Sequence, residues 1–272
     1  MTEDLLKKYD RLTEYLASFG NLAVAFSGGV DSAFLLYAAH DALGDKALAI
    51  TATAQSFPKR EGDEAAEFCA NRGIRQAFVE FDEFSVEGFA DNPPDRCYIC
   101  KKALFTRMLA IAAEEGCMAL AEGSNLDDNG DYRPGLRAIA ELGVKSPLRE
   151  IGFTKQEIRD LSEHFGLPTW NKQSFACLAS RFPYGDRITD EKLEMVGRAE
   201  QLLLDLGFKQ LRVRIHGDVA RIELRPEDFD SFMSEEVRQR VYSEFKKYGF
   251  SYAALDIMGY RTGSMNEKLK NA

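Results

Sequence analysis

The residues best suited to chemistry form a glycine- and serine-rich turn near the amino terminus. It runs Ser27-Gly28-Gly29-Val30-Asp31-Ser32 and follows the short apolar segment 22–26. Two glycines allow the backbone to approach an anion with no Cβ in the way. The amides of the turn and of a following helix donate to that anion, and the hydroxyls of Ser27 and Ser32 add donors. A plain serine-capped turn is the alternative, but the full hexapeptide predicts a phosphate site; without a Gly-Lys-Ser/Thr ending it is not a Walker A loop.

Polar residues also follow two other apolar runs of the chain. Thr51 and Ala52 close the second run, and Gly123 and Asp127 follow the fourth. In an open parallel sheet, ligands lie in the crevice outside the carboxyl ends of the strands. We therefore expect these residues to line the same nucleotide site as the glycine-rich turn.

Three charged residues after the fourth run have the chemistry of a phosphoryl-transfer site. Asp127 and Asp128 are adjacent carboxylates, and Mg²⁺ binds through such oxygen ligands. A solvated acidic turn is the alternative for this pair. Arg133, in a Tyr-Arg-Pro-Gly stretch, is expected to stabilise negative charge that develops on phosphate.

The spacing of the cysteines predicts a metal or cluster ligand set. Their odd number, five, argues against a disulfide framework. Cys97 and Cys100 form a Cys-x-x-Cys pair that we expect to precede a helix over 105–115. Two thiols at this spacing bind one metal ion or one cluster iron. A single pair supplies only two ligands, so further ligands must come from elsewhere in the chain.

The other three cysteines differ in their surroundings. Cys177 lies in an irregular segment close to Arg181, where a cation favours the reactive thiolate; an inert, half-buried thiol is the alternative. Cys69 falls in a helical pattern and Cys117 at the start of a predicted strand. Both are expected to be small hydrophobic residues of the core.

Arginines mark a second candidate site towards the carboxyl terminus. Arg212 and Arg214 lie two residues apart on a predicted strand, so both face the same side of it. Glu223 lies across a predicted hairpin. Two forked guanidinium groups on one face suit a phosphate. A solvated sheet face with cross-strand Arg–Glu pairs is the alternative.

The elements that must position these residues follow from the order of apolar and periodic segments. Short apolar runs alternate with amphipathic segments through the first 170 residues, which predicts a doubly wound parallel α/β sheet. We expect a domain over 1–170, an active-site loop or linker over 171–187, and a small α+β domain over 188–272. Expected strands span 22–26, 46–53, 75–80, 118–122, 211–216, 220–224 and 253–258. Expected helices span 3–19, 32–43, 59–72, 105–115, 153–165, 189–206 and 228–248.

Composition narrows the class of protein. The chain has 272 residues, 45% of them hydrophobic, and a net charge of −9. This charge disfavours a nucleic-acid partner, because tight binding needs a basic face. No run of apolar residues is long enough to span a membrane. The first residues do not form a signal peptide, which predicts a cytoplasmic protein.

The hexapeptide 27–32 resembles the signature of the PP-loop ATP pyrophosphatases, an adenine nucleotide alpha hydrolase-like fold. Cys-Tyr-Ile-Cys-Lys, Arg-Pro-Gly and Ala-Cys-Leu-Ala-Ser-Arg follow in order, and together they resemble the LarE family over nearly the whole chain. That resemblance implies an ATP-dependent sulfurtransferase. Its expected substrate is pyridinium-3,5-biscarboxylic acid mononucleotide, and its product serves synthesis of the nickel-pincer nucleotide cofactor.

The resemblance also implies roles for particular residues. Residues 27–32 would bind the leaving pyrophosphate, with Asp31, Arg133 and Cys177 catalytic. The carboxyl-terminal domain would bind substrate and form a homo-oligomer. The implied substrate-phosphate ligands are Arg181, Arg212 and Arg214; Glu200 and Glu223 would bind a metal or order that site.

Two sulfur sources remain open within the family. In one branch a single cysteine, here Cys177, gives up its own sulfur. In the other, three cysteines, here Cys97, Cys100 and Cys177, hold a 4Fe-4S cluster; their number favours this branch. The competing functions are a tRNA thiolase, an amide-forming ligase such as NAD synthetase, and a zinc-binding module on an inactive ATPase fold.

Overall fold

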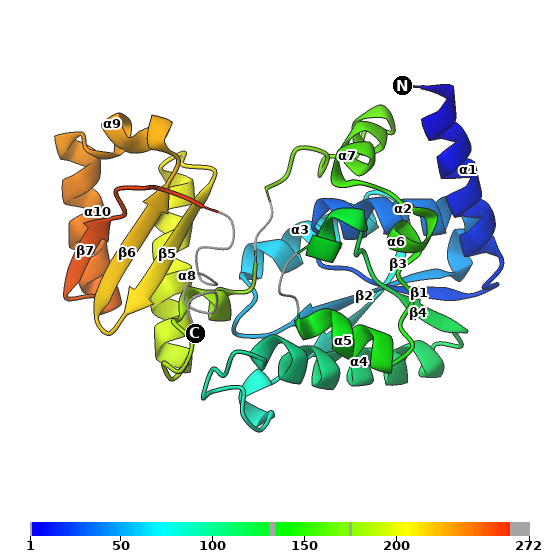
Figure 1. The fold of residues 1–272 in the computed structure, drawn as a ribbon, viewed down its shortest axis with the longest axis horizontal. Helices are drawn as coiled ribbons and strands as arrows, with labels where there is room; N and C mark the ends of the chain where they lie inside the picture. Colours follow the sequence, from blue (N-terminus) through cyan, green and yellow to red (C-terminus); the bar gives the residue numbers. More distant parts are fainter. Residues whose placement is uncertain (1, 131–133, 174–175, 262–272) are drawn as a thin grey trace. The chain divides into compact units, whose positions relative to one another are not determined.

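The computed structural model describes residues 2–130, 134–173 and 176–261 (Figure 1). The chain divides into two compact units. The first comprises Met1–Val86 and Asp95–Phe175, and the second comprises Glu87–Pro94 and Ala176–Ala272. The short segment Glu87–Pro94, which the sequence placed in the amino-terminal domain, therefore packs with the second unit. No helix among the described residues is long and apolar enough to cross a membrane.

The first unit is built on a parallel four-stranded sheet. The strands are β1 (Leu22–Ala25), β2 (Ala47–Thr53), β3 (Arg75–Glu80) and β4 (Ala119–Ala121), in the order β3-β2-β1-β4. The helices are α1 (Glu3–Ala17), α2 (Val30–Leu43), α3 (Lys59–Ala70), α4 (Arg96–Glu114), α5 (Pro134–Glu141), α6 (Pro147–Ile151) and α7 (Lys155–His164).

Helices cover both faces of this sheet, as Figure 1 shows. Alternate strand residues point to opposite faces. Val24 of β1 packs in the core formed with α1, α2 and α7, whereas Ala23 packs against α4. Strands β1 and β4 are therefore apolar throughout, as expected for strands buried on both sides, whereas the edge strand β3 is partly polar and largely exposed. The predicted doubly wound α/β fold is confirmed.

The second unit has a small mixed sheet. β5 (Leu211–His216) and β6 (Val219–Leu224) form an antiparallel hairpin, and β7 (Tyr252–Leu255) lies parallel to β6. The helices are α8 (Asp190–Asp205), α9 (Phe229–Phe232) and α10 (Glu235–Tyr248). The predicted smaller α+β region is present.

Two helix predictions were wrong, and the short helices α5 and α6 were not predicted. The helix expected over 105–115 begins at Arg96, so Cys97 and Cys100 lie inside it rather than before it. α5 begins at Pro134, and proline suits the first position of a helix. The helix expected over 228–248 is interrupted, because Ser234 is the N-cap residue of a new helix.

Candidate active site

The glycine-rich turn joins β1 to α2 and has the geometry of an anion site. Gly28 has φ +72°, and a Cβ there would lie 3.1 Å from the carbonyl oxygen of Glu61. The N-cap of α2 is Gly29, which has no side chain to cap the first amides of the helix. Ser32 Oγ lies 3.1 Å from Ser27 Oγ and donates to the carbonyl of Gly29. The turn is thus shaped in advance, with helix amides available to an anion.

Asp31 anchors a polar cluster beside this turn. Its Oδ2 accepts a hydrogen bond from Lys155 Nζ at 2.5 Å, and its Oδ1 accepts from Asn125 Nδ2 at 3.2 Å. Gly123, after β4, lies so close to α2 that a Cβ would be 2.9 Å from the amide nitrogen of Ser32. The segment following β4 and the start of α7 therefore meet at the turn.

Lys155 was missed by the sequence reasoning, although it carried a signal. It is the first residue of α7, whose N-cap Thr154 forms a capping box with Glu157. A cation is unfavourable at a helix amino terminus because of the helix dipole. A lysine in that position indicates a stabilising partner elsewhere, which here is Asp31.

Lys172 was also missed, and it fixes the turn from the other side. Its Nζ donates to the carbonyl of Gly28 at 3.0 Å and pairs with Glu61 at 2.7 Å and Glu64 at 2.6 Å. Arg159 in turn donates to the carbonyl of Lys172 at 2.9 Å. The conformation of Gly28 thus depends on a residue far along the chain.

The remaining nucleotide-site predictions lie at the strand ends of the first unit. Thr51 is buried near the end of β2, where its Oγ1 accepts from Gln76 Nε2 at 2.8 Å. Ala52 is the next residue of the same strand. Parallel pairing of β2 with β1 directs this end towards the same edge as the turn at 27–32. Arg133 lies outside the described residues.

Asp127 and Asp128 lie in a 3₁₀ turn spanning Leu126–Gly130. Asp127 Oδ2 accepts from the amide of Lys155 at 2.7 Å, and Asp128 Oδ2 accepts from the amide of Asn125 at 2.9 Å. Both carboxylates therefore shape the polar cluster. Mg²⁺ is usually bound through one or two carboxylates together with substrate phosphates, so this donor set suits a nucleotide-bound magnesium ion.

The cysteines differ in exposure. Cys97 is exposed and Cys100 partly exposed, three residues apart on the first turns of α4. Cys97 Sγ lies 3.6 Å from Nη2 of Arg96. Cys177, also partly exposed, precedes a 3₁₀ turn of the second unit, Leu178–Arg181.

Of the other two thiols, Cys69 is buried, whereas Cys117 is partly exposed, as Cys100 and Cys177 are. Burial raises the pKa of Cys69 to about 11 and also raises the pKa of Cys117. Cys117 lies just before β4 rather than at its first residue. Across the described parts of the chain, no three His, Cys, Asp or Glu side chains are grouped as a metal site. Thiolates are nevertheless the usual cluster ligands, so the accessible cysteines have the chemistry such a group needs.

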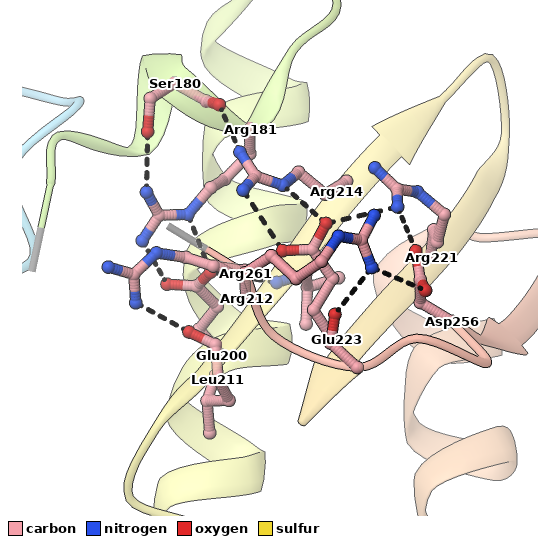
Figure 2. Close-up of polar contacts among 12 residues, drawn as sticks. Ser180, Arg181, Glu200, Leu211, Arg212, Arg214, Arg221, Glu223, Asp256 and Arg261 are labelled. Atoms are coloured by element: carbon pink, nitrogen blue, oxygen red, sulfur yellow. Dashed lines mark hydrogen bonds and ion pairs between the residues drawn. The ribbon is translucent and has the colours of Figure 1, made fainter. Parts of the chain in front are cut away.

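The second unit contains a buried cluster of arginines, drawn in Figure 2. Arg181 and Glu200 form a two-pronged pair, with nitrogen–oxygen distances of 2.7 and 2.9 Å. Arg214 and Glu223 form a second pair, with two distances of 3.1 Å. Arg212 is also buried, so the predicted strand arginines do not form a solvated sheet face.

Positive charge exceeds negative charge in this cluster. Five arginines surround three carboxylates, which leaves a surplus of two positive charges (5 − 3 = 2). The members are Arg181, Arg212, Arg214, Arg221, Arg261, Glu200, Glu223 and Asp256. Burial, followed by the nearby charge of Arg181, lowers the pKa of Arg212 to about 10. Because the guanidinium of Arg212 is buried beside another cation, an added anion would stabilise its charged form, as expected of a phosphate site.

The carboxylates Glu200 and Glu223 order these arginines. The two oxygens of Glu200 accept from Arg181, and one of them also accepts from the amide of Val213 at 2.9 Å. Burial by itself would raise the pKa of Glu200, but the charge of Arg181 outweighs it and holds that pKa below its ordinary value. The predicted alternative role, binding of a metal, stays a prediction.

Replacing Glu200 with alanine is expected to lower the free energy of unfolding by about 3–5 kcal/mol, because Arg181 is left buried without its partner. Urea denaturation followed by circular dichroism measures this loss. The matched control is Glu194→Ala on the exposed side of the same helix, which should change little. A Glu200→Ala protein as stable as this control would contradict the buried pair.

The lowered pKa of Glu200 also makes the free energy of unfolding depend on pH. Its stabilising contribution is present above the ordinary carboxyl pKa of 4.5 and is lost as pH falls through the lower folded value. Wild-type protein should therefore lose stability in acid more steeply than Glu200→Gln. Parallel acid denaturation curves for the two proteins would argue against this assignment.

The chain is similar to known proteins along almost its full length. No family model matches the chain. It is 38% identical to pyridinium-3,5-bisthiocarboxylic acid mononucleotide synthase of Lactiplantibacillus plantarum, over 98% of this chain and 97% of that protein. An uncharacterized protein of Synechocystis is 40% identical over 97% of this chain and 99% of its own length. A glutamine-hydrolyzing GMP synthase subunit of Archaeoglobus fulgidus is 27% identical, over 68% of this chain and 64% of its own.

Proposed function

Because the chain belongs to the LarE family of pyridinium-3,5-bisthiocarboxylic acid mononucleotide synthases, we propose that it is an ATP-dependent sulfurtransferase. It would activate a carboxylate of pyridinium-3,5-biscarboxylic acid mononucleotide as the acyl adenylate and replace the AMP with sulfur. The observation that supports this proposal is the 38% identity to the Lactiplantibacillus plantarum protein, which extends over almost the full length of both chains. The aligned length includes the candidate sites of both units.

The first unit would carry out adenylation. A substrate carboxylate oxygen attacks the α-phosphorus of ATP, and pyrophosphate leaves with the electron pair of the broken P–O bond. The turn at residues 27–32 would bind this leaving group through its amides and hydroxyls. Lys155, held by Asp31, would neutralise its negative charge. Arg133 is proposed to assist at the same phosphates.

Three further residues would hold the rest of the nucleotide. Thr51, Ala52 and Gly123 lie at or beyond the carboxyl ends of β2 and β4, where adenosine is expected. Asp127 and Asp128 would hold Mg²⁺ against the phosphates. When bound, the ion would draw negative charge from the departing oxygens.

The second unit would bind the phosphate of the pyridinium mononucleotide. Arg181, Arg212 and Arg214 are buried, and the cluster around them has surplus positive charge. Guanidinium groups bind phosphate in a forked arrangement. Glu200 and Glu223 would keep these forks in position before the substrate arrives.

The source of sulfur is the finer part of the proposal. Cys97, Cys100 and Cys177 would hold a 4Fe-4S cluster, since the accessible thiols match the ligands of that group. When bound, the cluster would supply the sulfur that displaces AMP. The alternative is sacrificial transfer, in which Cys177 gives up its own sulfur.

A tRNA thiolase is the runner-up function, because it shares the PP-loop and the use of sulfur. The net charge of −9 favours the small mononucleotide over RNA. The direct test is incubation of the purified protein with ATP and each substrate, followed by mass spectrometry. A thiocarboxylate together with pyrophosphate is expected with the mononucleotide; thiolation of tRNA alone would overturn the proposal.

Arg214→Ala is expected to raise the KM for the pyridinium mononucleotide by about ten-fold or more while changing the KM for ATP little, because a lost forked phosphate contact costs at least ~1.4 kcal/mol. Steady-state kinetics with each substrate varied in turn measure the difference. The control is Arg240→Ala, which removes an exposed arginine of α10. An equal rise in both KM values would show that the substitution destabilises the protein instead of removing a contact with the mononucleotide.

A further inference from the structure

The first two turns of α4 carry the Cys-x-x-Cys pair, and the amino terminus of this helix has no side-chain cap. Its N-cap, Asp95, makes no capping hydrogen bond with its side chain, whereas Thr154 and Thr189 cap α7 and α8. An uncapped first turn frays more readily, because its leading amides have no partners within the helix. Thiols on such a turn are held in place only if another contact fixes it.

Tyr98, between the two cysteines, makes that contact with α5. Its hydroxyl donates to Glu141 Oε2 at 2.7 Å. Lys102, one turn further along α4, donates to the Tyr98 hydroxyl at 2.8 Å and to the same Glu141 oxygen at 2.9 Å. The Arg137 guanidinium lies over the Tyr98 ring, 3.7 Å from its centre. Four side chains thus join the start of α4 to α5.

The two helices also approach closely behind this network. A Cβ at Gly135 would lie 2.6 Å from Cδ of Lys101, so the side chain of Lys101 packs on the α5 backbone. Hydrogen bonds from Lys102 and then Tyr98 lower the pKa of Glu141, which keeps the acceptor ionised. The contact therefore combines close packing with charged partners.

Tyr98 and the cysteines lie on different sides of α4. Residues three or four apart share a helix face. Tyr98 and Lys102 form the side turned to α5, and Cys97 and Cys100 form the neighbouring side. Holding one side against α5 fixes the direction of the other.

We propose that Tyr98 is a positioning residue that clamps the first turn of α4 to α5 and so holds the Cys97 and Cys100 thiols ready to bind a cluster. This inference rests on the proposed function for its use of the cluster. The clamp itself is a property of the apoprotein, because each of its contacts is made between side chains of α4 and α5.

The test compares wild type, Tyr98→Phe and Tyr98→Leu in the full-length chain. Phenylalanine keeps the ring under Arg137 and loses the hydroxyl, whereas leucine loses both. The alkylation rates of Cys97 and Cys100 in the apoprotein should rise by roughly two- to five-fold in Tyr98→Leu, as a surface contact of this strength implies. Tyr98→Phe should lie between the two. Tyr242→Leu, which removes an exposed tyrosine stacked with Lys246 on α10, is the matched control.

Iron content and the electron paramagnetic resonance spectrum after anaerobic reconstitution give the second readout. Tyr98→Leu should hold less iron than wild type, whereas pyrophosphate release should change less than two-fold. Wild-type alkylation rates and iron content in Tyr98→Leu would overturn the inference. A wild-type protein that binds no iron would instead reject the proposed cluster, and the alkylation rates would still test the clamp.

Discussion

Replacing Asp31 with alanine is expected to lower the rate of pyrophosphate release by about 100- to 1,000-fold, the effect of losing one preorganised charge-stabilising group. Asp31 is the common acceptor for Lys155 and Asn125, so its removal releases Lys155, the cation proposed to neutralise the leaving pyrophosphate. The turn at 27–32 keeps its remaining hydrogen bonds. A coupled assay for pyrophosphate with ATP and the mononucleotide measures the loss.

Asp45→Ala is the matched control, because Asp45 is exposed beyond the other end of α2. Lys155→Met should resemble Asp31→Ala, and the double variant should be little worse than either, since the two residues act as one unit. Ser32→Ala, which removes a donor of the same turn, should also lose pyrophosphate release. A folded Asp31→Ala protein that still cleaves ATP at the wild-type rate would refute the assignment of the turn.

The parallel sheet could be predicted because its signal is local. Strands β1, β2 and β4 coincide with short, mainly apolar runs, and helical patterns separate the strands. The start of α4 could not be predicted in this way. Its first two turns carry Arg96, Cys97 and Lys101, whose polar and metal-binding types are not typical of a buried helix. The contacts of Tyr98 with α5 stabilise helix there, and those contacts are tertiary.

The candidate phosphate site also depends on tertiary contacts that the local sequence does not predict. The turn at 27–32 is a contiguous motif, so its residues alone predict an anion site. Lys155 and Lys172 lie 124 and 144 residues from the groups they bind, Asp31 and the carbonyl of Gly28. No periodicity in the sequence links such positions. Only the disfavoured placement of a lysine at the start of α7 gave a hint.

Burial separates one of the five cysteines, Cys69, from the others. Cys69 is buried, and burial raises its pKa, which disfavours the thiolate that binds iron. Burial also raises the pKa of Cys117, although this residue is partly exposed. Cys97, Cys100 and Cys177 are all at least partly accessible. Exposure thus excludes Cys69 as a ligand, whereas the choice of Cys97, Cys100 and Cys177 over Cys117 rests on the motifs and on the family resemblance.

Single replacement of Cys97, Cys100 or Cys177 by alanine is therefore expected to remove most of the iron from anaerobically reconstituted protein. A cluster with three protein ligands does not tolerate loss of one, and it leaves one iron free for an added sulfide. Cys69→Ala and Cys117→Ala should retain iron and colour. Iron and sulfide analysis measures the first effect, and repeated turnover with added sulfide measures the second. A colourless wild-type protein that acts once and loses the mass of H₂S at Cys177 alone would identify that residue as the sacrificial sulfur donor.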